Sequence, residues 1–152
     1  MKVTTTRFGE IEVNEDLVIN FEGPIIGYDH LKRYLIIDQS ETSCFKWLQS
    51  VDDGSMAFPV TTASYFNIDY NFEITDEDAE KIGLNSVEDL IVLNIATVPG
   101  NQPMKTTINL KAPIIASFSA RKAMQIILPD DKYPIKYPLF GNKAPTPPKK
   151  ED

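Results

Sequence analysis

Apolar and polar residues alternate with a period of two along much of the chain, which is typical of strands that bury one face. The longest alternation covers residues 106–118. One of its faces carries Ile108, Leu110, Ala112, Ile114, Ala116 and Phe118. Pro113 interrupts this stretch, and proline cannot donate a ladder hydrogen bond. We therefore expect two strand segments that meet at a bend or bulge near Pro113, or an edge strand there.

Shorter alternations cover residues 17–21, 56–60, 70–74 and 135–139. Residues 34–37 and 90–98 are apolar on both sides, which predicts central strands buried on both faces. Turn-forming residues separate these segments at Gly9 and within 22–24, 52–54, 99–101 and 129–131. Such closely spaced short strands predict a mostly β, single-domain, antiparallel barrel-like or sandwich fold.

One or two short helices complete the predicted fold. Thr75 can cap a helix from Asp76 to about Ile82, with Gly83 as its stop. A second turn is predicted to begin at Ser86. We expect residues 1–140 to form the folded domain and residues 141–152, which are rich in proline and lysine, to be a disordered tail.

The charge balance limits the classes of partner. The 152 residues include 22 acidic and 15 basic side chains, a net charge of −7. This charge disfavours direct binding to nucleic acid or to an anionic membrane. The net charge either keeps the protein soluble or attracts a basic partner, and we prefer the first interpretation. We expect a cytoplasmic protein for three reasons: the chain has a single cysteine, we recognise no signal peptide, and no apolar run is long enough to span a membrane.

Candidate catalytic and metal-binding patterns are weak. The only histidine, His30, cannot form a multi-histidine metal site and is expected at the surface. Cys44 is expected to be structural, although Lys46 would share its strand face. The acidic residues 76–80 lack the ligand spacing of an EF-hand. Glycine spacing fits no phosphate-binding loop. We therefore expect no enzyme activity, no cofactor and no metal.

Two other segments carry bulky residues beyond those that a plain core needs. Residues 21–28 form an apolar loop between glycines, and residues 45–50 contain the only tryptophan, Trp47. Apolar loop residues are typical of interaction sites. Tryptophan is common at binding hot spots and also in cores, and we favour the core for Trp47.

Several segments together resemble the FliW family of flagellar assembly factors. They are residues 6–13 (TRFGEIEV), 21–28 (FEGPIIGY), 45–50 (FKWLQS) with 57–58, 107–114 (TINLKAPI), 125–128 and 133–135. The resemblance covers roughly residues 3 to 140. Residues 61–66 lack a proline associated with that region of the family, a departure confined to one loop.

This resemblance implies a compact barrel-like protein that is not an enzyme. Members of the family bind flagellin in the cytoplasm and also bind CsrA, a small basic translational repressor, away from its RNA-binding surface. Export of flagellin frees the factor to capture CsrA, and flagellin translation resumes. The implied partners are therefore flagellin and CsrA, with no direct contact to nucleic acid or membrane.

The predicted contact surface has an apolar and an acidic part. The apolar part is the loop residues Glu22, Pro24, Ile25, Ile26 and Tyr28. The acidic part, Asp52, Asp53, Asp76, Glu77 and Asp78, would steer basic CsrA. Turn chemistry and helix capping also explain these residues without any partner.

Other functions and another mode of contact stay open at this stage. A barrel could hold a small apolar ligand in its interior. A hydrolase would need two facing carboxylates. An exposed barrel edge could also pair with a segment of flagellin by strand addition.

Overall fold

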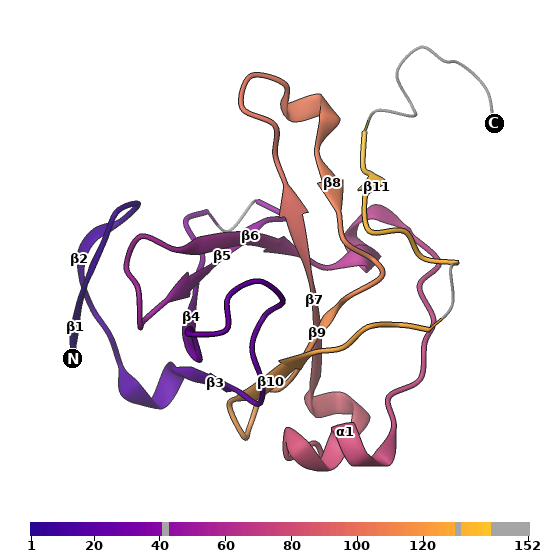
Figure 1. The fold of residues 1–152 in the computed structure, drawn as a ribbon, viewed down its shortest axis with the longest axis horizontal. Coiled ribbons are helices and arrows are strands. Elements are labelled where there is room, and N and C mark those ends of the chain that lie inside the picture. Colours follow the sequence, from indigo (N-terminus) through magenta and orange to yellow (C-terminus); the bar gives the residue numbers. More distant parts are fainter. Residues whose placement is uncertain (41–42, 130–131, 141–152) are drawn as a thin grey trace.

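The computed structural model describes residues 1–40, 43–129 and 132–140. Most of the alternating segments are strands in it (Figure 1). The strands are β1 Lys2–Thr5, β2 Gly9–Glu12, β3 Ile19–Phe21, β4 Arg33–Ile37, β5 Lys46–Ser50, β6 Ala57–Thr61, β7 Leu90–Thr97, β8 Thr107–Ile108, β9 Ile114–Ser117, β10 Lys122–Gln125 and β11 Tyr137–Pro138. The predicted disordered tail lies outside the described residues.

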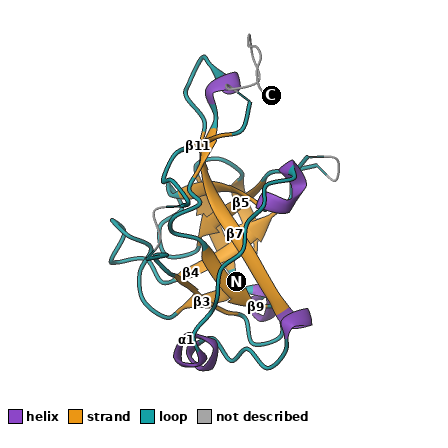
Figure 2. Ribbon diagram, turned by 90° about the vertical axis from the view of Figure 1, so that its right-hand side faces the viewer, coloured by secondary structure: helices purple, strands orange, loops and turns teal. Residues whose placement is uncertain are grey.

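Seven of these strands close into a barrel. They follow one another in the order β7, β6, β5, β4, β3, β10 and β9, and pairing of β9 with β7 completes the ring (Figure 2). The predicted mostly β, barrel-like fold is confirmed. The β3–β10 seam is parallel, whereas its neighbours in the ring are antiparallel. Strands β8 and β11 extend the sheet beyond β7 as a projecting arm.

The helical predictions hold for both segments. Helix α1, Asp76–Lys81, starts where the Thr75 hydroxyl accepts a hydrogen bond from the Asp78 backbone N–H at 3.0 Å. Gly83 ends it with a φ of +68°. The turn predicted after Ser86 is the 3-10 helix η3, Val87–Asp89; the other 3-10 helices are η1 Glu15–Leu17, η2 Ala63–Phe66 and η4 Pro103–Lys105.

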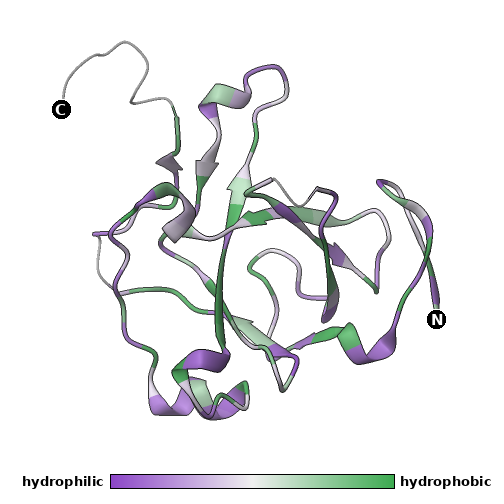
Figure 3. Cartoon of the chain, turned by 180° about the vertical axis from the view of Figure 1, so that it is seen from behind, coloured by the Kyte–Doolittle hydropathy of each residue, from purple (hydrophilic) through white to green (hydrophobic). Residues whose placement is uncertain are grey.

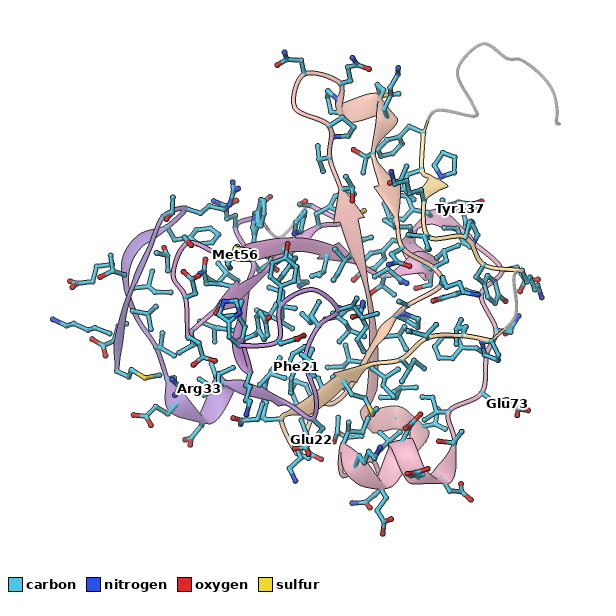
Figure 4. The ribbon with its side chains drawn as sticks, in the orientation of Figure 1. Phe21, Glu22, Arg33, Met56, Glu73 and Tyr137 are labelled. Atoms are coloured by element: carbon cyan, nitrogen blue, oxygen red, sulfur yellow. The ribbon has the colours of Figure 1, made fainter. Side chains whose placement is uncertain are left out.

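Side chains that point into the barrel pack against one another. Tyr34 is fully buried, with its ring centroid 4.8 Å from that of Phe21 and 6.2 Å from that of Phe58. Figure 3 shows the apolar character of β7, and Figure 4 shows Phe21 directed into the centre of the molecule. Because these side chains occupy the interior, the barrel is unsuited to an enclosed apolar ligand.

A second core lies beneath the arm, where Ile108, Leu110 and Tyr133 are buried. A third, formed by Val3, Val13 and Val18, joins the β1–β2 hairpin to the outer face of the barrel.

The predicted strand at residues 70–74 is wrong. This segment is irregular, and at Asn71 a tyrosine side chain takes the place of a neighbouring strand. The Tyr133 hydroxyl accepts a hydrogen bond from the Asn71 backbone N–H at 2.8 Å and donates to the Asn71 carbonyl at 3.0 Å. The Tyr70 hydroxyl donates to the Leu110 carbonyl at 2.5 Å. The two backbone groups of Asn71 therefore need no ladder partner.

Other strand predictions need smaller corrections. Leu17 is 45% exposed, because the Asn14 side chain caps η1 and this turn places Val18 in the core instead. Phe118 is 57% exposed, because β9 ends before it. The central runs are β4 and β7, each paired on both sides. Neither is buried throughout as predicted, because β4 is only partly buried after Tyr34 and β7 is fully buried only at Leu93, Asn94 and Ala96. Val98, at the end of the predicted run, is 48% exposed. The predicted break is confirmed, since β8 and β9 are separate strands and Pro113 is buried between them.

Candidate protein-binding groove

The loop between β3 and β4 is held in a tight, specific shape. Gly23 and Gly27 have φ values of +99° and +93°, which only glycine adopts readily. The Tyr28 backbone N–H donates to the Ile25 carbonyl at 2.8 Å. Ile25 is 2% exposed and belongs to the barrel core, whereas Ile26 is 58% exposed. The loop is therefore anchored by one isoleucine and presents the next.

An apolar groove of about 510 Å³ separates this loop from the arm. The far wall comes from the end of β7 and from Asn109, Lys111, Ala112, Gln125, Ile127, Ile135 and Lys136. Tyr28 and Phe58 line it, with ring centroids 4.9 Å apart in an edge-to-face contact. Three isoleucines at the groove are largely exposed: Ile26, Ile127 at 62% and Ile135 at 60%.

One glutamine fixes the width of this groove between the loop and the far wall. The Gln125 side-chain oxygen accepts a hydrogen bond from the Ile26 backbone N–H at 2.9 Å. Its side-chain nitrogen donates to the Ala112 carbonyl at 3.1 Å. The two walls are thus joined by a single side chain from β10. A cluster of exposed apolar residues on a rigid frame is typical of a protein-binding surface.

The predicted acidic residues at the β5–β6 turn have structural partners. Asp52 accepts hydrogen bonds from the backbone N–H groups of Lys32 and Arg33 at 2.9 and 3.0 Å. Its carboxylate also pairs with the Arg33 guanidinium at 2.8 Å. Burial opposes ionisation of Asp52, but these donors outweigh it and hold the pKa of its carboxyl below the usual range. Asp53 accepts from the Ser55 hydroxyl at 2.7 Å.

The acidic helix start lies apart from the loop. Helix α1 stands at the lower edge of the molecule in Figure 1 and contributes no residue to the groove. Glu77 pairs with Lys81 at 3.7 Å, and Asp78 donates its backbone N–H to the Thr75 cap. Of the predicted contact residues, the structure therefore places Ile25, Ile26 and Tyr28 at the groove. Asp76, Glu77 and Asp78 lie on another face.

Sequence reasoning missed the groove residues Ile127, Ile135 and Lys136 as candidate contacts. They come from segments more than ninety positions after the loop, and the alternation around Ile135 indicated only a strand face. Their signal was indirect, because residues 125–128 and 133–135 belong to the segments that resemble the FliW family.

Trp47 is neither a core residue nor a free surface residue. The Arg7 guanidinium lies 3.8 Å above its ring centroid, and Phe8 packs edge-on at 6.4 Å. The indole N–H donates to the Gln39 side chain at 3.1 Å. The prediction of a core position is thus wrong, since Trp47 is partly buried and fastens the β1–β2 hairpin to the barrel.

Catalytic and metal chemistry finds little support among the described residues. His30 is exposed as predicted. Cys44 is exposed rather than packed. The shifted carboxyl pKa values, those of Asp52, Asp53 and Asp89, all move downward, as hydrogen-bonded carboxylates do. No group of three potential metal ligands occurs in the described part of the chain. Within that part, no helix is long and apolar enough to cross a membrane.

Known proteins match this chain over nearly its whole length. The family model described as FliW protein matches residues 2–139. The flagellar assembly factor FliW of Caldicellulosiruptor saccharolyticus is 40% identical over 140 residues, covering 92% of this chain and 91% of the relative. That of Caldanaerobacter subterraneus subsp. tengcongensis is 41% identical over 141 residues, covering 92% and 93%.

A solved structure agrees with these sequence matches. A crystal structure of the flagellar assembly factor FliW superposes with a TM-score of 0.85 at 28% identity, covering 99% of this chain and all of that chain. With a closed seven-strand barrel, a family match over residues 2–139 and relatives at about 40% identity, this chain belongs to the FliW family of flagellar assembly factors.

Proposed function

We propose that this protein is a non-enzymatic cytoplasmic regulator that binds flagellin and binds and antagonises CsrA. Its family membership across residues 2–139 carries the proposal. When flagellin is abundant it occupies the protein, and when flagellin is exported the freed protein captures CsrA. Synthesis of flagellin is thereby coupled to its export, through competition for one protein.

The groove supports a role in binding proteins. Ile26, Ile127 and Ile135 expose apolar surface around a space of about 510 Å³ that none of the described residues covers. Burial of such surface against a partner stabilises a complex by roughly 25 cal/mol per Å² of apolar area removed from water, before the costs of association are subtracted. The net charge of −7 also suits encounter with the basic CsrA.

Isothermal titration tests the proposal directly. The full chain is titrated with flagellin and with CsrA, and each titration is repeated with the other partner already present. We expect saturable binding to both partners, with each one weakening the binding of the other. The absence of heat and of a complex with either partner would refute the function.

A matched pair of variants tests the groove within the same experiment. Ile26→Ser removes an exposed apolar side chain at the groove, and Val87→Ser removes one that is 83% exposed on η3. We expect Ile26→Ser to weaken the binding of at least one partner by about tenfold, equivalent to about 1.4 kcal/mol. Val87→Ser is expected to leave the affinity for both partners unchanged. Equal effects of the two substitutions would exclude the groove as a binding site.

A further inference from the structure

Strand β10 extends beyond the end of β3, the strand with which it pairs in parallel. It contacts β3 only through Lys122 and Ala123, because β3 ends at Phe21 and the chain leaves for the loop. The last bond of this seam runs from the Glu22 backbone N–H to the Ala123 carbonyl at 2.8 Å. The chain after β10 continues alongside residues 111–113, so one of its edges loses its partner.

The unpaired edge is centred on Ile127. The backbone N–H groups of Ile126 and Leu128 donate to the carbonyls of Pro113 and Lys111 at 3.0 and 2.8 Å. In an antiparallel ladder the intervening residue directs its N–H and C=O to the opposite side. Those two groups of Ile127 have no hydrogen-bond partner among the described residues. An exposed edge of this kind is a template for another strand.

This edge lies at the apolar groove, which the side chains of Ile26 and Ile135 line together with that of Ile127. An extended peptide seated there would exchange backbone hydrogen bonds with Ile127 and bury apolar side chains against the isoleucines. That combination is the recognition mode of strand addition, in which the main chain supplies affinity and the side-chain pockets supply specificity.

The charge at the groove points to the chemistry of the occupant. The protein carries 22 acidic residues, yet none of those in the described part of the chain lines the groove. Its charged lining residues are Lys111 and Lys136, and Lys136 is exposed and forms no ion pair with any described residue. An apolar segment that carries an acidic residue complements this lining, whereas a strongly basic partner does not.

We propose that the groove binds an extended apolar segment of flagellin, carrying an acidic residue, as an added strand along the Ile127 edge. The identity of this occupant rests on the function proposed above. On this assignment CsrA, being basic, binds outside the Ile127 edge, where the lining carries lysines and not carboxylates.

Titration of flagellin and CsrA into three forms of the full chain tests this assignment. Ile127→Thr keeps the backbone N–H and loses apolar surface, whereas Ile127→Pro removes the outward-facing donor as well. We expect Ile127→Pro to bind flagellin at least about tenfold more weakly than Ile127→Thr does. Both variants are expected to bind CsrA with the affinity of the wild type. Circular dichroism and thermal unfolding establish that each variant is folded.

Amide hydrogen exchange of the wild-type protein tests the same edge without a substitution. The Ile127 amide is expected to exchange freely in the unbound protein and at least about tenfold more slowly in the flagellin complex, while the Val87 amide is unchanged. An Ile127 amide that stays unprotected in a saturated flagellin complex refutes the proposal of an added strand. This test does not depend on whether the Ile127→Pro variant folds.

Charge reversal tests the chemistry of the occupant. Lys136→Glu is expected to weaken the binding of flagellin several-fold and to reduce the dependence of that binding on salt concentration. Lys2→Glu on the β1–β2 hairpin is the control, with no expected effect. A flagellin affinity that survives both Lys136→Glu and Ile127→Pro refutes this site but leaves the proposed function standing. A wild-type protein that binds neither partner refutes the function itself.

Discussion

Two tyrosines, one fully buried and one partly buried, offer a test of how hydrogen bonding sets the stability of this fold. Tyr34 is fully buried in the barrel core, and its hydroxyl has no partner among the described residues. The hydroxyl of Tyr70 donates to the Leu110 carbonyl at 2.5 Å and accepts from the Asn94 side chain at 3.2 Å. Phenylalanine removes the hydroxyl oxygen from each site, and only at Tyr70 does this removal break hydrogen bonds to described residues.

The expected changes in the free energy of unfolding have opposite signs. A buried polar group without a partner costs about 1–3 kcal/mol, so Tyr34→Phe is expected to stabilise the protein by about 1 kcal/mol. Tyr70→Phe leaves the Leu110 carbonyl and the Asn94 amide with a lost partner and is expected to destabilise it by about 1–3 kcal/mol. A change of 1 kcal/mol corresponds to roughly 2–4 °C in Tm at this size.

Urea unfolding followed by the fluorescence of Trp47, the only tryptophan, measures both values. The slope of the free energy against urea should be the same in all three proteins, which confirms that one transition is being compared. A Tyr34→Phe protein that is less stable by more than about 1 kcal/mol would refute the reasoning. It would mean that the Tyr34 hydroxyl is bonded to a buried water.

Three further predictions concern pH, one turn and one ion pair. Burial raises the pKa of Tyr34 and of Tyr70 to about 12. Stability should therefore be complete below pH 10 and fall as the pH rises toward 12, because only the unfolded chain ionises there. Urea midpoints at pH 9 and 11 measure this loss, and an unchanged midpoint contradicts it. Gly54→Ala would place a Cβ 1.8 Å from the Thr4 carbonyl oxygen. Displacement of β1 should lower stability by about 1–3 kcal/mol in thermal unfolding, and an unchanged Tm argues against that contact. Asp52→Asn removes an ion pair and should cost about 1–2 kcal/mol at pH 7. Because the pKa of Asp52 is lowered in the fold, the wild type should lose this advantage as the pH falls through that pKa, and a difference that persists in acid counts against the ion pair.

Local patterns were sufficient for many individual elements. The period-two alternation located β6, the doubly apolar runs located β4 and β7, and Thr75 with Gly83 marked both ends of α1. These features depend on neighbours in the chain, such as a capping hydroxyl or a left-handed glycine. For this reason the sequence could predict them without knowledge of distant contacts.

The same reasoning failed where a distant side chain decides the backbone. Residues 70–74 alternate like a strand, but Tyr133 satisfies the Asn71 backbone from more than sixty positions away. Asp52 looked like a free charge for steering a partner, and its pairing with Arg33 became visible only in the fold. Such contacts leave no local pattern, because both partners are ordinary residues in their own segments.

The sequence by itself determined the fold class, the family and the ends of α1, because periodicity, composition and capping act within a few residues. It also marked the loop at residues 22–28 as a candidate contact, which stays a prediction. Only the tertiary structure decided that Ile25 is buried while Ile26 is exposed, and that Ile127 and Ile135 stand opposite that loop. Closure of the barrel brings these segments together, and an unpaired strand edge is defined by which strand ends first beside it.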